Sequence, residues 1–165
     1  MSRRDGISFF GPQDIERLDV LMASFLRETQ ASCAILVDRS GRLLVSVGDT
    51  GSMDRITFAS LVAGDFAASD QLASLLGEPE FSSLYHQGEG RSMFLADVGG
   101  WAILAALFDG RTTLGMVRVK SKVVVPKFTM LFADLAARGP AAPLSELQAE
   151  WAAEAEDEID RLFAD

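Results

Sequence analysis

Few residues in this sequence are able to perform covalent or acid–base chemistry. The chain contains one histidine, His86, and one cysteine, Cys33, separated by 53 residues. A thiolate and an imidazole make a nucleophilic pair only when the two side chains lie within hydrogen-bond reach. Sequence spacing cannot establish such proximity, and no adjacent residue suggests an activating partner. His86 follows Tyr85 in a strand-like stretch, where a structural histidine is the more ordinary interpretation.

Motifs for phosphate, cofactor or metal binding are missing from the sequence. It contains no G-x-x-x-x-G-K-[ST] loop and no G-x-G-x-x-G after a strand-like run, so we expect no cofactor. His and Cys residues at metal-ligand spacing are also absent. A carboxylate group near the C-terminus lacks the D-x-D-x-D-G pattern of a calcium loop, and a solvated acidic surface is the better interpretation: Glu154, Glu156, Asp157, Glu158 and Asp160. We therefore expect no enzyme active site and no metal, and predict that surfaces carry the function.

Composition narrows the class of protein. The 165 residues are 48% hydrophobic, which is enough for one domain with a real core. With 15 Lys and Arg against 24 Asp and Glu, the net charge is −9 and argues against a nucleic-acid partner. The basic stretch around residues 118–127 is too small to change this expectation. One cysteine cannot form an internal disulfide.

Membrane and export signals are not visible in the sequence. The longest apolar run, 101–108, has eight residues, whereas a membrane-spanning helix needs about 20. Arg3 and Arg4 are not followed by an apolar stretch of the kind found in a signal peptide. We therefore expect a cytoplasmic protein without membrane insertion.

The charge divides the chain into unequal parts. Residues 1–143 contain 14 basic and 16 acidic side chains, a balance of −2, whereas residues 144–165 contain eight acidic side chains and one arginine, a balance of −7. Between them, Gly139-Pro140-Ala141-Ala142-Pro143 reads as a helix stop followed by a stiff segment. We predict a domain over 1–138, a linker over 139–143 and an acidic amphipathic tail over 144–165.

Hydrophobic spacing predicts an α+β domain with an antiparallel sheet. Helical periodicity begins after Pro12, and two apolar runs around the Asp38–Gly41 turn indicate a β-hairpin. The run 101–108 has no polar residue and should form a central strand that is covered on both faces. The predicted order is α-β-β-α-β-β-β-α, with helices over 13–30, 54–76 and 112–136 and strands over 33–37, 43–47, 83–87, 92–98 and 101–108.

Two of these helices carry an ambiguity. The middle of 54–76 is rich in small residues, which either pack under the domain's own sheet or let another backbone approach closely. The segment 112–136 has a helical stripe but also β-branched residues and Pro126, so propensity alone would allow a strand up to Val125. We predict one long helix, kinked between Lys122 and Pro126. Arg111 precedes it and reads as a turn residue ahead of a cap at Thr112 or Thr113.

The tail combines acidity with an apolar ridge. Apolar residues recur at helical spacing with glutamates on the opposite face: Leu144, Leu147, Trp151, Ala155, Ile159 and Leu162. Such a helix is marginal alone in water, and carboxylates near its C-terminal end oppose the helix dipole. Trp151 and Phe163 favour a segment that orders on binding. The alternatives are a solubilising tail or one folded onto its own domain.

Three stretches of the sequence form a recognisable set: ASCAILVDRSGRLLVSVG, ASLVAGDFAASDQLASLLGE, and LYHQGEGRSMFLADVG followed by AILAALFDGRTTLGMVR. These stretches resemble the Roadblock/dynein-light-chain family, in particular its bacterial MglB-like branch. The acidic ending around Glu158–Phe163 is similar too. The resemblance covers about residues 13–136 and 156–163, and it implies a profilin-like Roadblock fold with a five-stranded sheet. Pro126, its preceding valines and the long alanine-rich tail depart from the family pattern.

The resemblance implies a regulatory partner without an active site of its own. MglB-like proteins are homodimers that bind a small Ras-like GTPase, MglA-like, and stimulate its GTP hydrolysis in the control of cell polarity and motility. The GTPase would supply its own catalytic Arg and Gln, while the dimer holds its switches in place. Arg55 is the arginine nearest the expected platform. The tail would bind a second GTPase surface away from the nucleotide and assist exchange.

Site residues follow from this resemblance. The expected GTPase-binding residues are Ser60, Ala63, Gly64, Ala67, Asp70, Gln71, Ile159, Leu162 and Phe163. The expected dimer interface is formed by Ala68, Leu72, Leu84, Tyr85, His86 and Gln87. Two other functions stay open: a Roadblock adaptor that does not stimulate hydrolysis, and a small-molecule sensor, against which the lack of convergent polar groups counts.

Overall fold

The computed structural model describes residues 10–138 together with residues 153 and 161, so the predicted linker and nearly all of the predicted tail lie outside it. The chain forms three helices and five strands in the order α1 (Pro12–Thr29), β1 (Cys33–Asp38), β2 (Leu43–Gly48), α2 (Arg55–Leu75), β3 (Ser83–Gln87), β4 (Ser92–Val98), β5 (Ala102–Phe108) and α3 (Leu114–Arg138). This confirms the predicted α-β-β-α-β-β-β-α order. Among the described helices, none is long and apolar enough to cross a membrane.

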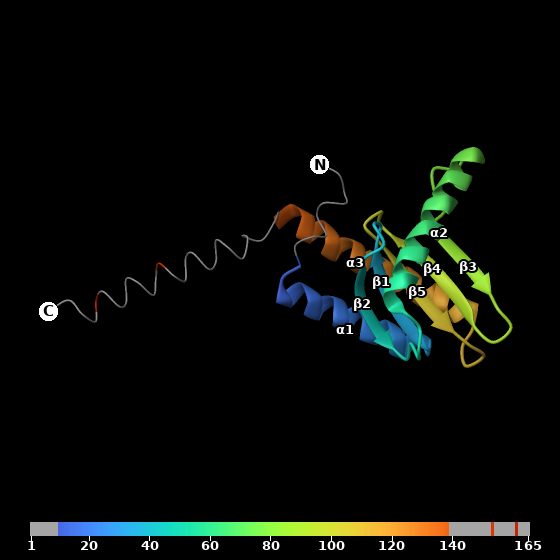
Figure 1. Ribbon diagram of the computed structural model, residues 1–165, viewed down its shortest axis with the longest axis horizontal. Coiled ribbons are helices and arrows are strands. Elements are labelled where there is room, and N and C mark those ends of the chain that lie inside the picture. The colour runs from blue at the N-terminus through green and yellow to red at the C-terminus, as the bar shows by residue number, and fades with distance from the viewer. Residues whose placement is uncertain (1–9, 139–152, 154–160, 162–165) are drawn as a thin grey trace.

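The strands form one antiparallel sheet in the order β2-β1-β5-β4-β3 (Figure 1). β1 and β5 are buried along almost their whole length, and for β5, at the centre of the sheet, the apolar run 101–108 predicted this. The predicted strand 101–108 starts one residue before the observed one, because Trp101 belongs to the turn that precedes β5. Because β3 pairs only with β4, the other edge of β3 is open among the described residues.

Helices cover both faces of the sheet, which explains why β1 and β5 show no polar alternation. In β1, Ala34 and Leu36 belong to the core under α1 and α3, whereas Cys33, Ile35 and Val37 belong to the core under α2. Successive side chains of a strand point to opposite faces, so each central strand serves two cores. α2 lies alone on its face, and α1 and α3 lie together on the other (Figure 1).

α2 begins at a side-chain cap. The Asp54 carboxylate accepts hydrogen bonds from the amides of Ile56 at 3.1 Å and Thr57 at 3.2 Å. Its other oxygen accepts a bond from the Thr57 hydroxyl at 2.6 Å. The bonds from the Thr57 hydroxyl and amide hold the pKa of Asp54 below its ordinary value. This cap fixes where the small-residue stretch of α2 starts.

The segment around Pro126 is helical throughout. α3 continues through the proline, and the residues at helical spacing, from Val117 to Leu135, are buried against the sheet. Val119 and Val123 are exposed, so the β-branched residues that favoured a strand lie on the solvent side. Pro126 lacks the amide hydrogen that would bond the carbonyl of Lys122, and both residues are exposed to water. Periodic burial therefore outweighs β-propensity here.

Candidate functional site

The outward side of α2 is the first candidate surface. Its inward side packs on the sheet through Ala59, Val62, Phe66, Ser69 and Ala73. The small residues divide between the two sides: Ala59 and Ala73 pack under the sheet, whereas Gly64, Ala67 and Ala68 are exposed. We call the exposed side the outward α2 face and define it by Ser60, Leu61, Gly64, Ala67, Ala68, Gln71, Leu72 and Leu75.

The outward α2 face has small side chains at its centre and exposed leucines around them. A Cβ built on Gly64 would meet no atom within 4 Å, so the domain itself does not require a glycine there. Leu61, Leu72 and Leu75 are 68%, 56% and 84% exposed. Exposed apolar side chains grouped on one helix face are typical of a protein–protein contact. The sequence pointed to the small residues and Leu72 but not to the other two leucines, since a leucine at helical spacing normally indicates core.

Two expected contact residues of α2, Ala63 and Asp70, are only partly exposed. Asp70 accepts a hydrogen bond from Arg39, with Nη1 and Oδ2 3.3 Å apart. Arg39 also bonds Asp97 of β4, and its guanidinium lies 4.9 Å from the centre of the Phe66 ring. Arg39 thus ties α2 to the sheet. Its partners are 31 and 58 residues away along the chain, so no sequence pattern pointed to it.

The expected dimer residues lie on two elements: Ala68 and Leu72 on α2, and Leu84 to Gln87 at the open edge of β3. Leu84 packs in the core under α2, and His86 Nε2 lies 2.7 Å from Asp65 Oδ2 of α2. Tyr85 points to the other side of the sheet and stacks on Phe108 with ring centres 6.3 Å apart. Gln87 is exposed. The structure therefore brings the β3 edge and α2 into one continuous region of the surface.

The same sheet separates Cys33 from His86. Cys33 pairs with Leu107, Leu107 with Met93, and Met93 with His86, so three inter-strand spacings, about 14 Å, lie between the two residues. Burial raises the pKa of the Cys33 thiol, which keeps it protonated and unreactive. No cysteine–histidine centre forms. Among the described residues, no cluster of three His, Cys, Asp or Glu side chains is arranged to hold a metal ion.

Comparison with known proteins identifies this architecture. The family model for the Roadblock/LC7 domain matches residues 17–108, which run from the second turn of α1 to the end of β5. The chain belongs to the Roadblock/LC7 family. No curated protein sequence matches it.

Solved structures place this Roadblock domain near MglB proteins. Myxococcus xanthus MglB is 33% identical, with a TM-score of 0.72 over 76% of this chain and 95% of that one. The gliding protein MglB from Thermus thermophilus is 32% identical, with a TM-score of 0.70 over 76% of this chain and 96% of that one. A profilin from Schizosaccharomyces pombe shares the fold at 14% identity, with a TM-score of 0.53 over 68% of this chain and 96% of that one.

Arg111, Arg55 and three tail residues of this Roadblock chain were also singled out from the sequence. Arg111 bonds Asp109 at 3.0 Å and the Ser32 hydroxyl at 3.1 Å, while Thr113 accepts the amide of Met116 at the start of α3. Arg111 is thus a turn residue before a helix cap, as predicted. Ile159, Leu162 and Phe163 lie outside the described residues. Arg55 is exposed in the first turn of α2.

Proposed function

We propose that this protein is a homodimeric regulator that binds a small Ras-like GTPase and stimulates its GTP hydrolysis. The observation that carries the proposal is the outward α2 face, where small side chains lie exposed between leucines. A surface of this shape suits close approach by another backbone, with apolar contacts around it. Similarity to MglB proteins over 76% of the chain supports the same function.

The position of β3 supports the dimer. Its open edge offers unpaired backbone groups, which a second copy of the strand can pair. Because His86 on this edge contacts Asp65 of α2, pairing two β3 edges would bring two α2 helices side by side. The two outward α2 faces would then form one platform. Ala68 and Leu72 would lie where the two helices meet.

In this proposal the protein adds no catalytic group to the GTPase. The GTPase supplies its own arginine and glutamine, and the platform stabilises the switch conformation that is competent for hydrolysis. The Cys33 thiol is buried and about 14 Å from His86, so neither belongs to a nucleophilic centre in this chain. Arg55, exposed at the start of α2, is the side chain to test for a direct role.

The second contact in the proposal is made by the tail, residues 144–165. Its apolar ridge, with Ile159 and Leu162, would bind together with Phe163 to a GTPase surface away from the nucleotide. The proposed setting is the control of cell polarity and motility in the cytoplasm.

The deciding experiment measures GTP turnover by the cognate Ras-like GTPase with and without this protein. We expect stimulation by the unchanged chain and by Arg55→Ala. Ala67→Arg should return turnover to the level of the GTPase alone, because a long cation blocks the platform. The matched control is Ala23→Arg, which places the same change at an exposed alanine of α1, on the other side of the sheet.

Three results would change the proposal. Full stimulation by Ala67→Arg would remove Ala67 from the contact. Binding to the GTPase without stimulation would make the protein a Roadblock adaptor. A monomer in light scattering would remove the two-helix platform.

A further inference from the structure

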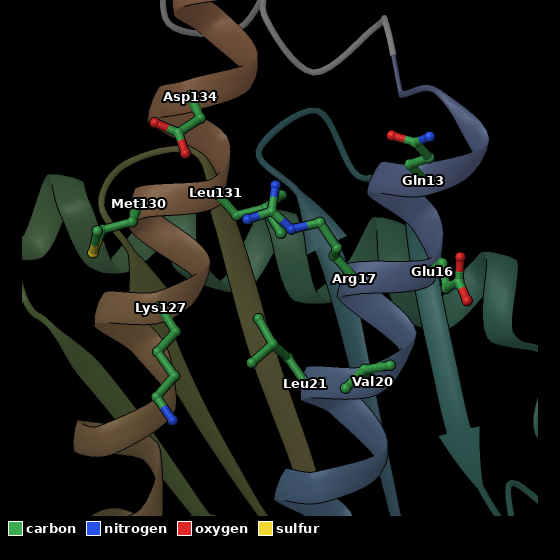
Figure 2. A pocket seen from close by; sticks show the side chains of 9 residues that line it. All are labelled: Gln13, Glu16, Arg17, Val20, Leu21, Lys127, Met130, Leu131 and Asp134. Carbon is green, nitrogen blue, oxygen red and sulfur yellow. The ribbon is translucent and has the colours of Figure 1, made fainter.

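A groove runs between α1 and α3, on the side of the sheet opposite α2 (Figure 2). It has a volume of about 600 Å³, and its apolar lining comes from Val20 and Leu21 of α1 and from Met130 and Leu131 of α3. Val20 is 64% and Met130 69% exposed, although each lies mid-helix beside a packed core. Methionine adapts its shape readily to an incoming apolar surface. The groove is therefore an apolar surface suited to a helix.

Two interhelix ion pairs mark the ends of this groove. Arg138 and Asp14 join the last turn of α3 to the first turn of α1 at 2.7 Å. Lys120 and Glu28 join the other ends at 3.1 Å, beside a smaller hollow that continues the groove through Leu21 and Lys127. The two pairs thus link α1 to α3 near both ends of the groove.

The charged side chains within the groove favour an acidic occupant. Arg17 extends across it toward Leu131, and Lys127 lines it from α3 (Figure 2). Neither cation forms a salt bridge with another residue of the described range 10–138. Of the two acidic lining residues, Glu16 points to the far side of α1, and Asp134 lies near the end of α3 (Figure 2). The middle of the groove thus presents two cations beside apolar side chains.

We propose that the chain's own tail, residues 144–165, docks as a helix in this groove. The tail has a balance of −7 and an apolar ridge at helical spacing, which matches a groove with an apolar lining and two central cations. The ridge from Leu144 to Leu162 would be about 27 Å long as a helix. The groove is lined from Gln13 to Leu21 of α1, about 12 Å by the same rise per residue, and the smaller hollow continues this line to Glu28.

The chain leaves the domain at the correct end. α3 ends at Arg138, one turn beyond Asp134, and a five-residue linker spans at most about 17 Å when extended. The tail can therefore turn back beside Asp134 and run antiparallel to α3. Counting residue for residue from there sets Trp151 opposite Lys127 and Glu158 opposite Lys120. Trp151 then stacks on the Lys127 cation, and Glu158 lies beside the Lys120–Glu28 pair.

Because the tail is covalently attached to the domain, a weak contact is sufficient to keep it in the groove for much of the time. A short linker gives an effective concentration in the millimolar range, so a docking site of millimolar affinity is occupied about half of the time. The docked ridge is the same one that the proposed function assigns to the GTPase, and the two sites then compete for it. That competition rests on the proposed function, whereas docking in the groove does not.

The test uses the fluorescence of Trp151 in the full-length chain without any GTPase. The protein has two tryptophans, so Trp101→Phe leaves Trp151 as the single emitter. We expect blue-shifted emission, protection from acrylamide quenching, and no change on tenfold dilution. Val20→Glu and Met130→Glu, made in the same background, should give the emission of a free tail peptide. Ile15→Glu alters an exposed apolar residue of α1 outside the groove and should leave the emission unchanged.

Each other outcome overturns the proposal. Solvent-like emission in the Trp101→Phe protein shows that the tail is undocked. Protected emission that persists in both groove variants places the tail elsewhere. Protection that is lost on dilution assigns the groove to the tail of another copy. Circular dichroism melts of every variant show whether a changed emission reflects unfolding. Because no GTPase is present, none of these results bears on stimulation of GTP hydrolysis.

Discussion

Arg39 Nη1 lies 3.3 Å from Asp70 Oδ2, and this contact joins the β1–β2 turn to the middle of α2. The same guanidinium bonds Asp97 of β4 and covers the Phe66 ring. The Arg39 side chain is only 16% exposed, so it forms a largely buried ionic link between α2 and the sheet. Asp70, expected at the rim of the GTPase contact, already uses one carboxylate oxygen to hold α2 in place.

Replacing Arg39 should loosen α2. Arg39→Met keeps a long side chain over Phe66 but leaves the nearly buried Asp97 carboxylate without its cation. We expect a loss of about 2–3 kcal/mol in the free energy of unfolding, or roughly 8 °C in thermal midpoint. Asp70→Asn should lose less than about 1 kcal/mol, because Asp70 is 41% exposed and Arg39 keeps Asp97. Equal losses in the two variants would contradict this ranking; denaturant unfolding measures both.

Substitutions at Gly64 can separate an effect on the stability of the fold from an effect on the GTPase contact. A methyl group there meets nothing in the domain, and alanine is a better helix former than glycine. Gly64→Ala should therefore stabilise the domain by about 0.5–1 kcal/mol, which raises the thermal midpoint by about 3 °C. Gly64→Leu should also fold but lose stimulation of GTP turnover, since the larger side chain blocks close approach to the platform. Full stimulation by Gly64→Leu would place the GTPase contact elsewhere.

Asp14 gives the domain a defined response to acid. Burial alone would raise the pKa of this carboxyl, which is 5% exposed, but hydrogen bonds from Arg138 at 2.7 Å and the Gly11 amide at 3.0 Å hold it below the ordinary 3.8. A carboxyl with a lower pKa in the folded state stabilises the protein above its unfolded pKa. This contribution disappears as the pH falls through the folded value.

Asp14→Asn should consequently lower the thermal midpoint by a constant amount between about pH 7 and pH 5. The difference from the unchanged protein should shrink once the pH drops below about 3.8. Glu16→Gln, an exposed change two residues away, is the matched control for removing one carboxylate from this part of α1. A deficit in Asp14→Asn that grows in acid would contradict the assignment.

Sequence patterns identified the elements because burial in this fold is periodic. Residues 101–108 predicted a strand covered on both faces, the apolar runs around Asp38–Gly41 predicted a hairpin, and the stripe through 112–136 predicted a helix despite Pro126. The sequence could not show which of the small residues of α2 face the sheet and which face solvent. Alanine and glycine suit both a packed and an exposed position, so only the structure shows that Ala59 is buried while Ala67 is exposed.

The two least predictable features depend on contacts between distant segments. Arg39 reads as an ordinary turn residue until β4 and α2 bring Asp97 and Asp70 to it. The groove between α1 and α3 arises from packing: Val20 is an exposed apolar residue among polar neighbours on α1, and Met130 follows the exposed Val119 and Val123 along α3. The resemblance to MglB-like sequences supplied the expected contact residues of α2 and β3 but gave no indication of this groove.

Deleting residues 144–165 should separate the tail's role from that of the platform. The β3 edge and the outward α2 face both lie before residue 138, so light scattering should still show a dimer. We expect the affinity for the GTPase to fall about tenfold, a loss of about 1.4 kcal/mol, because one of two contacts is removed. Stimulation at saturating concentration should persist, since the platform is intact.

The matched variant keeps the acidic charge of the tail and changes only Ile159, Leu162 and Phe163 to serine. A loss of GTPase affinity equal to that of the deletion assigns the contact to these apolar side chains. If calorimetry finds the same GTPase affinity with and without the tail, the tail makes no second contact with the GTPase.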